Sequence, residues 1–152
     1  MIKITIHTLA VTVILVAGVA ASLQEPSKQQ RPALQAFEHY DAVRAALATD
    51  KLAPVAAHAK QLAEHAEQLG GADAKKAADA LAAAKSLEDA RKHFGDLSAI
   101  LVPVFQAEAI PGAFAFICSM KEKTWIQKGD KVANPYYGRK MRTCGSPLPP
   151  TK

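Results

Sequence analysis

The chain has 152 residues, 49% of them hydrophobic, and carries a formal net charge of +5 at pH 7. This length provides for one domain with a modest core and excludes a large multidomain protein. The composition also argues against nucleic-acid binding, because only Tyr136 and Tyr137 lie among the C-terminal basic residues as groups that could stack on bases.

The first 21 residues are predicted to be a signal peptide. Lys3 and the amino terminus give a positively charged start, residues 4–21 are largely apolar, and the run ends in the small residues 18–22. An uncleaved membrane anchor is the alternative, because about 18 apolar residues are just enough to span a bilayer. A cleaved signal predicts a mature protein in the bacterial periplasm, without stable insertion in the membrane.

Two amphipathic helices are predicted after this segment. Residues 22–31 are polar and contain a proline, so they are interpreted as a linker. Helical periodicity covers residues 34–47, with Pro32 in the first turn, where a missing amide proton is harmless. A second apolar stripe covers residues 52–69, and Asp50 is its expected N-cap.

Further helical segments follow a glycine pair. Gly70 and Gly71 are expected to end the second helix, and an alanine-rich helix is predicted over residues 73–84. Residues 86–89 form a capping box for another helix, which Pro103 is expected to stop or kink. Short turns between amphipathic segments predict an antiparallel helical bundle, in which the many alanines allow close helix approach and leave a thin core.

The C-terminal part is predicted to form β structure. Residues 113–117 alternate with a period of two and contain aromatic and branched side chains, and residues 124–127 form a second short candidate strand. The expected fold is therefore mainly α, an antiparallel helical bundle with a small irregular C-terminal β cap. Residues 32–146 are expected to form this single domain, and residues 147–152, with three prolines, a disordered tail.

Four sulfur-containing residues lie in the expected cap, namely Cys118, Met120, Met141 and Cys144. An extended segment would place Cys118 and Met120 on one side, and a turn would bring Met141 and Cys144 together. Two thiolates and two thioethers would select Cu(I) or Ag(I) over harder ions. In an oxidising compartment, however, two cysteines form a disulfide by default. A soft-metal site and a Cys118–Cys144 disulfide are therefore both open.

The order of residues in the cap resembles that of a known family. The chain contains, in sequence, Cys118-x-Met120, Trp125-x-Gln127, Asn134-Pro135-Tyr136-Tyr137-Gly138 and Met141-x-x-Cys144-Gly145. This order is similar to an exported bacterial domain of unknown function, which also occurs at the C-terminus of periplasmic adaptor subunits of copper/silver efflux systems. The helical residues 40–47 and 90–98 look similar too, so the resemblance runs from about residue 36 to residue 145.

The resemblance implies copper handling, with Cu(I) or Ag(I) as the bound ion. It also implies copper/silver efflux components, or another envelope protein, as partners. Members of the family tend to carry Cys-Pro-Met with a histidine shortly upstream. Here Ser119 stands in place of the proline, and residues 114–117 contain no histidine. The implied ligand set of this chain is thereby reduced to cysteine and methionine.

No pattern typical of an enzyme is found in the sequence. There is no Gly-rich phosphate loop and no nucleophile, histidine and acid arrangement, so a non-enzymatic protein is expected. The histidines form no chelating motif either, because His58 and His65 lie about 10 Å apart along their predicted helix.

Basic residues are concentrated in the C-terminal part of the chain. Residues 119–152 contain eight Lys and Arg residues against Glu122 and Asp130, a net charge of +6. Such a segment could contact an acidic partner or a membrane surface, or it could form a solvated basic face.

Overall fold

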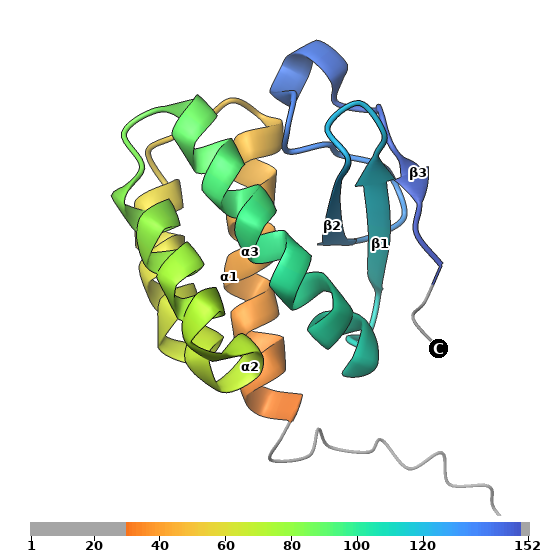
Figure 1. Ribbon diagram of the computed structural model, residues 1–152. Coiled ribbons are helices and arrows are strands. Elements are labelled where there is room, and N and C mark those ends of the chain that lie inside the picture. The colour runs from red at the N-terminus through yellow and green to blue at the C-terminus, as the bar shows by residue number, and fades with distance from the viewer. Residues whose placement is uncertain (1–29, 150–152) are drawn as a thin grey trace, which may run out of the picture.

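The computed structural model describes residues 30–149, which form three helices followed by a small antiparallel sheet (Figure 1). The predicted signal peptide and most of the predicted linker lie outside these residues. Helix α1, Gln30–Ala48, begins within the segment 22–31 that the sequence suggested as a linker. None of the helices within residues 30–149 has the length and apolar character needed to cross a membrane.

Helix α2, Val55–Ala83, is bent at the glycine pair that was predicted to end a helix. Gly70 has a φ of −137° and Gly71 a φ of 73°, so neither residue is helical. A Cβ atom at Gly70 would lie 2.7 Å from Ile100 Cγ2, so this glycine also permits α2 to approach the next helix closely. The predicted break is confirmed, and the two predicted helices are the two halves of α2.

The predicted N-cap of α2 is wrong. The helix is preceded by Pro54, which makes no side-chain cap hydrogen bond. Asp50 lies in the turn after α1 with a φ of 58°. Its carboxylate accepts hydrogen bonds from the Arg91 side chain and from the Arg139 amide. Asp50 therefore holds the C-terminal part of the chain against the helices instead of capping a neighbouring helix.

Helix α3, Leu87–Ala107, begins as predicted and continues past Pro103, so of the two predicted effects of this proline the stop is wrong. The Ser86 hydroxyl accepts a hydrogen bond from the Asp89 amide at 3.1 Å, which confirms the predicted N-cap. The helix continues through Pro103, whose side chain is exposed. Pro103 therefore does not end the helix at the position expected from the sequence.

The sheet has the strand order β2-β1-β3. Strand β1, Ala113–Cys118, pairs over its whole length with β2, Lys123–Lys128. These two strands confirm the predicted strands, each slightly longer than expected. The third strand was not predicted, because its two residues include a proline and carry no recognisable strand pattern.

The third strand also corrects the prediction of a disordered tail. Strand β3, Ser146–Pro147, pairs with the other edge of β1, where Phe116 lies opposite Pro147. The Leu148 amide donates a hydrogen bond to the Ala115 carbonyl at 2.8 Å. Backbone pairing with β1 therefore orders Pro147 and Leu148, while residues 150–152 lie outside the described part of the chain.

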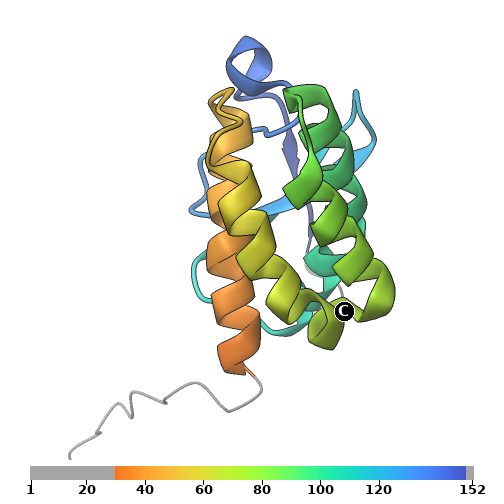
Figure 2. The same cartoon turned by 90° about the vertical axis from the view of Figure 1, so that its left-hand side faces the viewer.

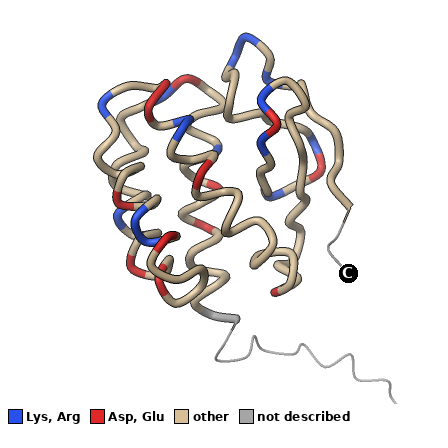
Figure 3. Tube along the Cα trace, viewed as in Figure 1, with Lys and Arg blue, Asp and Glu red and all other residues tan. Residues whose placement is uncertain are grey.

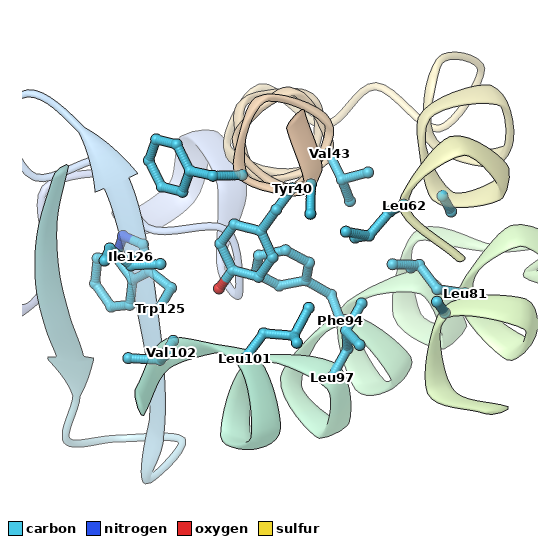
Figure 4. Close-up of a cluster of buried hydrophobic side chains, with 14 of the residues drawn as sticks. Tyr40, Val43, Leu62, Leu81, Phe94, Leu97, Leu101, Val102, Trp125 and Ile126 are labelled. Atoms are coloured by element: carbon cyan, nitrogen blue, oxygen red, sulfur yellow. The ribbon is translucent and has the colours of Figure 1, made fainter. Parts of the chain in front are cut away.

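The core lies between the helices and the sheet (Figure 4). Trp125 and Ile126 of β2 face side chains of α1 and α3, and both are almost fully buried. The ring of Tyr40 lies 4.8 Å from that of Phe94, measured between centroids. The Tyr40 hydroxyl lies 2.6 Å from Ser98 Oγ, so its polar end is satisfied inside the core. The sheet thus completes the core of the helices.

Helix α2 packs on the side away from the sheet, as the view from that side shows (Figure 2). Its buried side is rich in alanine, namely Ala59, Ala63, Ala66, Ala74 and Ala78. Small side chains allow the backbones to lie close together and contribute little apolar area each. The expected thin, alanine-rich core is found on this side of the molecule.

Candidate site at the Cys/Met cap

The two cysteines lie on neighbouring segments of the sheet. Cys118 is the last residue of β1 and is fully buried. Ile117 lies opposite Ser146 of β3, and in an antiparallel pair the residues before Ser146 run beside those after Ile117. Continued one residue further, this register places Gly145 opposite Cys118, and the half-buried Cys144 comes next along that segment. Both cysteines are free thiols in this structure.

The two methionines lie at the same end of the sheet. Met120 is in the turn after β1 and is 59% exposed. Met141 ends the 3-10 helix η1, Gly138–Met141, and is half-buried. The Cys144 amide donates to the Met141 carbonyl at 3.1 Å, so these two residues share one turn, as the sequence predicted. We call Cys118, Met120, Met141 and Cys144 the Cys/Met cap.

Met120 departs from the sequence expectation. Strand β1 ends at Cys118, and the Lys121 amide donates to the Cys118 carbonyl at 3.2 Å, which forms a tight turn. The extended arrangement that would place Met120 on the same side as Cys118 is therefore absent. Met120 is instead an exposed side chain at the tip of the β1–β2 turn.

Asn134 fixes the backbone around Cys144. Its Nδ2 donates to the Cys144 carbonyl at 2.6 Å, and its Oδ1 accepts from the Tyr136 amide at 2.7 Å. Its own amide donates to the Arg142 carbonyl at 2.7 Å. Asn134 is completely buried, so these hydrogen bonds are shielded from water. One side chain thereby ties the segment before η1 to the segment that carries Cys144.

Two glycines permit close contacts at the same place. Gly138 has a φ of 59°, and a Cβ atom there would overlap the Asp50 carboxylate and the Arg91 guanidinium. A Cβ atom at Gly145 would overlap the ring of Trp125. Lack of space for a Cβ atom therefore explains why glycine follows the Tyr-Tyr pair at position 138 and Cys144 at position 145.

Trp125 and Gln127 of β2 are two buried, hydrogen-bonded side chains beneath the loops of the cap. Trp125 is fully buried and stacks on Phe116, with 5.4 Å between ring centroids. Its Nε1 donates to Gln127 Oε1 at 2.9 Å, and Oε1 also accepts from the Ala133 amide at 3.1 Å. Gln127 Nε2 donates to the Lys131 carbonyl at 2.7 Å. The buried amide therefore fixes both the indole and the loop that leads to Asn134.

Tyr136 packs against the ring of Trp125. Its ring lies 6.0 Å from that of Trp125 between centroids, and its hydroxyl donates to the Thr124 carbonyl. Burial is the main cause that raises the pKa of Tyr136 above its ordinary value. The phenol therefore stays neutral and serves to pack the site.

Arg44 and Arg91 hold the loop of the cap on the helices. Arg91 Nε donates to the Pro135 carbonyl at 2.9 Å, and its Nη2 donates to the Leu47 carbonyl at 3.0 Å and to Asp50. Arg44 Nη1 donates to the Ala133 carbonyl at 3.4 Å. Sequence reasoning missed these contacts, because no local pattern connects helical arginines to a loop 89 or 44 residues later.

A hydrogen bond from Arg91 is the largest cause that lowers the pKa of Asp50 below its ordinary value. A carboxylate with a lowered pKa in the folded state adds stability above the ordinary Asp pKa, and this stability is lost as the pH falls through the lowered pKa. Asp50→Asn should therefore reduce stability at neutral pH and flatten the loss of stability on acidification. Thermal unfolding between about pH 7 and pH 3 measures this effect.

Asp130→Asn is the matched control, because Asp130 is exposed in the turn after β2. This control should leave the stability at neutral pH unchanged. Equal pH profiles for wild type and Asp50→Asn would show that the Asp50–Arg91 pair does not contribute to stability.

A basic hollow of about 500 Å³ lies beside the cap. Its lining residues are Glu88, Asp89, Arg91, Lys92, Lys121, Lys123, Tyr136, Tyr137 and Lys140. Lys and Arg stand on the β1–β2 turn and on η1, at the end of the sheet that carries the sulfur residues (Figure 3). Lys121 Nζ lies 5.4 Å from the centroid of the Tyr137 ring. Of the C-terminal basic residues, Lys121, Lys123 and Lys140 therefore line a hollow at the end of the sheet that carries the Cys/Met cap.

The donor set of the cap is dominated by sulfur. Within residues 30–149, no three His, Cys, Asp or Glu side chains gather closely enough to hold a metal ion. Any ion at the cap would thus depend on the two thiols together with methionine thioethers, which are donors for soft ions.

Comparison with known proteins finds a family model that matches part of the chain. Residues 36–110 match a family model described as a protein of unknown function, DUF3347. The match covers most of α1 and all of α2 and α3 and ends before β1, so the Cys/Met cap lies outside it. No curated protein and no solved structure matches the chain.

Proposed function

We propose that the chain is an exported, non-enzymatic protein that binds Cu(I) or Ag(I). Its residues 36–110 match the model of the DUF3347 family, whose function is unknown. The ligands would be the thiolates of Cys118 and Cys144, with the thioethers of Met120 and Met141. Its partners would be components of copper/silver efflux, as the resemblance of the cap implies. A bound ion would be cargo to be held or passed on.

The pairing of β1 with β3 is the observation that carries this proposal. It brings the segment that contains Cys144 alongside the end of β1 that carries Cys118, although 26 positions separate the two cysteines in the sequence. Both thiols are free, and thiolate and thioether donors select Cu(I) and Ag(I) over harder ions. Met120 is exposed two residues after the buried Cys118, so its thioether can be reached from solvent.

The test is a titration of the reduced protein with Cu(I) in competition with a chromogenic Cu(I) chelator. Wild type should bind one ion, and Cys118→Ser together with Cys144→Ser should weaken binding at least about tenfold, or about 1.4 kcal/mol. Ser146→Ala is the matched control, because Ser146 lies at the same end of the sheet without a sulfur atom. Unchanged affinity in the double variant contradicts the proposal.

A disulfide-stapled structural or interaction module is the second candidate. The same neighbouring placement of Cys118 and Cys144 would allow a bridge, and a closed loop of 26 residues stabilises by on the order of 3 kcal/mol. The mass of protein taken directly from its cell compartment separates the two. The disulfide-stapled module predicts a mass that is lower than that of the reduced chain by two hydrogens and does not change with copper. It also predicts that reduction lowers the melting temperature.

A further inference from the structure

Two histidines from different helices meet between α1 and α2. His39 lies on α1 and His58 on α2, and their Nδ1 atoms are 3.3 Å apart. The ring centroids are 5.6 Å apart, and the ring planes are inclined by 38°. Both side chains are half-buried. The two nitrogens therefore face one another at a place that a small solute can reach.

We propose that His39 and His58 bind a divalent transition-metal ion, Zn²⁺ or Cu²⁺, between α1 and α2. This site would be independent of the Cys/Met cap. In tetrahedral coordination, Zn–N bonds of about 2.05 Å place two ligand nitrogens about 3.3 Å apart. The observed separation of the Nδ1 atoms is 3.3 Å, so an ion can be bound without moving the helices apart.

The ring nitrogens already point toward one another. A hydrogen bond between two Nδ1 atoms requires one ring to donate its N–H and the other to offer its lone pair. When an ion binds to one side of the line between the two Nδ1 atoms, the proton on Nδ1 moves to Nε2 of the same ring. Both rings then offer the Nδ1 lone pair to the ion. The change is a shift of tautomer in one ring and leaves both imidazoles neutral.

The chemistry of the pair distinguishes it from the cap. Imidazole nitrogens suit Zn²⁺ and Cu²⁺, whereas sulfur donors suit Cu(I) and Ag(I). No third His, Cys, Asp or Glu completes a cluster within residues 30–149, so water would fill the remaining positions. The result is an open site, in which two protein ligands leave positions that a further ligand can occupy.

The experiment uses the full chain with Cys118→Ser and Cys144→Ser, so that the cap thiols cannot bind the ion. Titration calorimetry with Zn²⁺ should show one bound ion, and Zn²⁺ should raise the melting temperature. Adding His39→Ala or His58→Ala should weaken Zn²⁺ binding at least about tenfold and remove most of the rise in melting temperature. His65→Ala is the control, since His65 lies on the same helix and is also half-buried.

A second measurement uses wild type, in case the cysteine substitutions impair folding. Zn²⁺ should shift or broaden the NMR ring-proton signals of His39 and His58, while those of His65 and His93 stay in place. Equal Zn²⁺ affinity in the parent and in His39→Ala, or ring signals of His39 and His58 that do not respond, overturns the proposal. Because these readouts concern α1 and α2, they are independent of whether the cap binds Cu(I).

Discussion

Replacing Trp125 by alanine should lower the free energy of unfolding by about 3–5 kcal/mol. The indole is fully buried between Phe116 and Tyr136, so alanine would leave a large cavity between the sheet and the cap. The substitution also removes the donor that Trp125 Nε1 provides to Gln127. Chemical denaturation in urea, followed by circular dichroism, measures the loss.

Trp125→Phe is the control that separates packing from hydrogen bonding. Phenylalanine keeps an aromatic ring next to Phe116, and Gln127 Oε1 still accepts from the Ala133 amide. The loss should therefore be less than half of that caused by alanine. A loss of the same small size in both variants would show that the sheet adds little to the stability of the helices.

Replacing Asn134 by alanine should lower the free energy of unfolding by about 2–6 kcal/mol. The substitution leaves the Tyr136 amide and the Cys144 carbonyl without their partner, and each buried unpaired group costs about 1–3 kcal/mol. We also expect weaker Cu(I) binding in the competition assay, because the backbone at Cys144 is no longer held. Denaturation and Cu(I) titration of the same samples measure both effects.

Asn134→Asp is the matched variant for this experiment. Aspartate retains an oxygen that accepts from the Tyr136 amide but loses the donor to the Cys144 carbonyl. A folded Asn134→Asp protein with weakened Cu(I) binding would assign the effect to Cys144 specifically. Wild-type stability and Cu(I) affinity in Asn134→Ala would contradict the role given to Asn134.

The local features of the fold could be predicted from the sequence. Helical periodicity, the glycine pair at residues 70–71 and the Ser86 cap act over a few residues, and each is found where it was expected. The same holds for β1 and β2, whose alternating and aromatic residues are typical of strands. Local rules identify such elements because their causes lie within the element.

The connections between distant segments could not be predicted in the same way. Asp50 has the residue type of an N-cap, but its partners are Arg91 and the Arg139 amide. Strand β3 is a strand only because β1 offers it a free edge. The pairing of His39 with His58 likewise depends on how α1 packs against α2. In each case the sequence carries the residue, and the tertiary contact decides its role.

Some features of the candidate site could be predicted from the sequence and others could not. The sharing of a turn by Met141 and Cys144 follows from their spacing and was predicted. The alignment of the segment before Ser146 with the Cys118 end of β1 depends on β3, which no sequence pattern indicated. Asn134 was recognisable as a turn residue before proline, whereas its hydrogen bond to the Cys144 carbonyl was not.

The placement of β2 over the aromatic side of α1 and α3 has a consequence for the order of folding. The three helices are synthesised first. Trp125 and Ile126, which belong to the same buried cluster as Tyr40, Phe94 and Phe105, follow only after Phe105 has been made. Until then an apolar aromatic surface stays open to water and to other chains, a condition that favours aggregation. A chain that ends at residue 110 would keep this surface uncovered permanently, although it would contain the whole segment shared with the family.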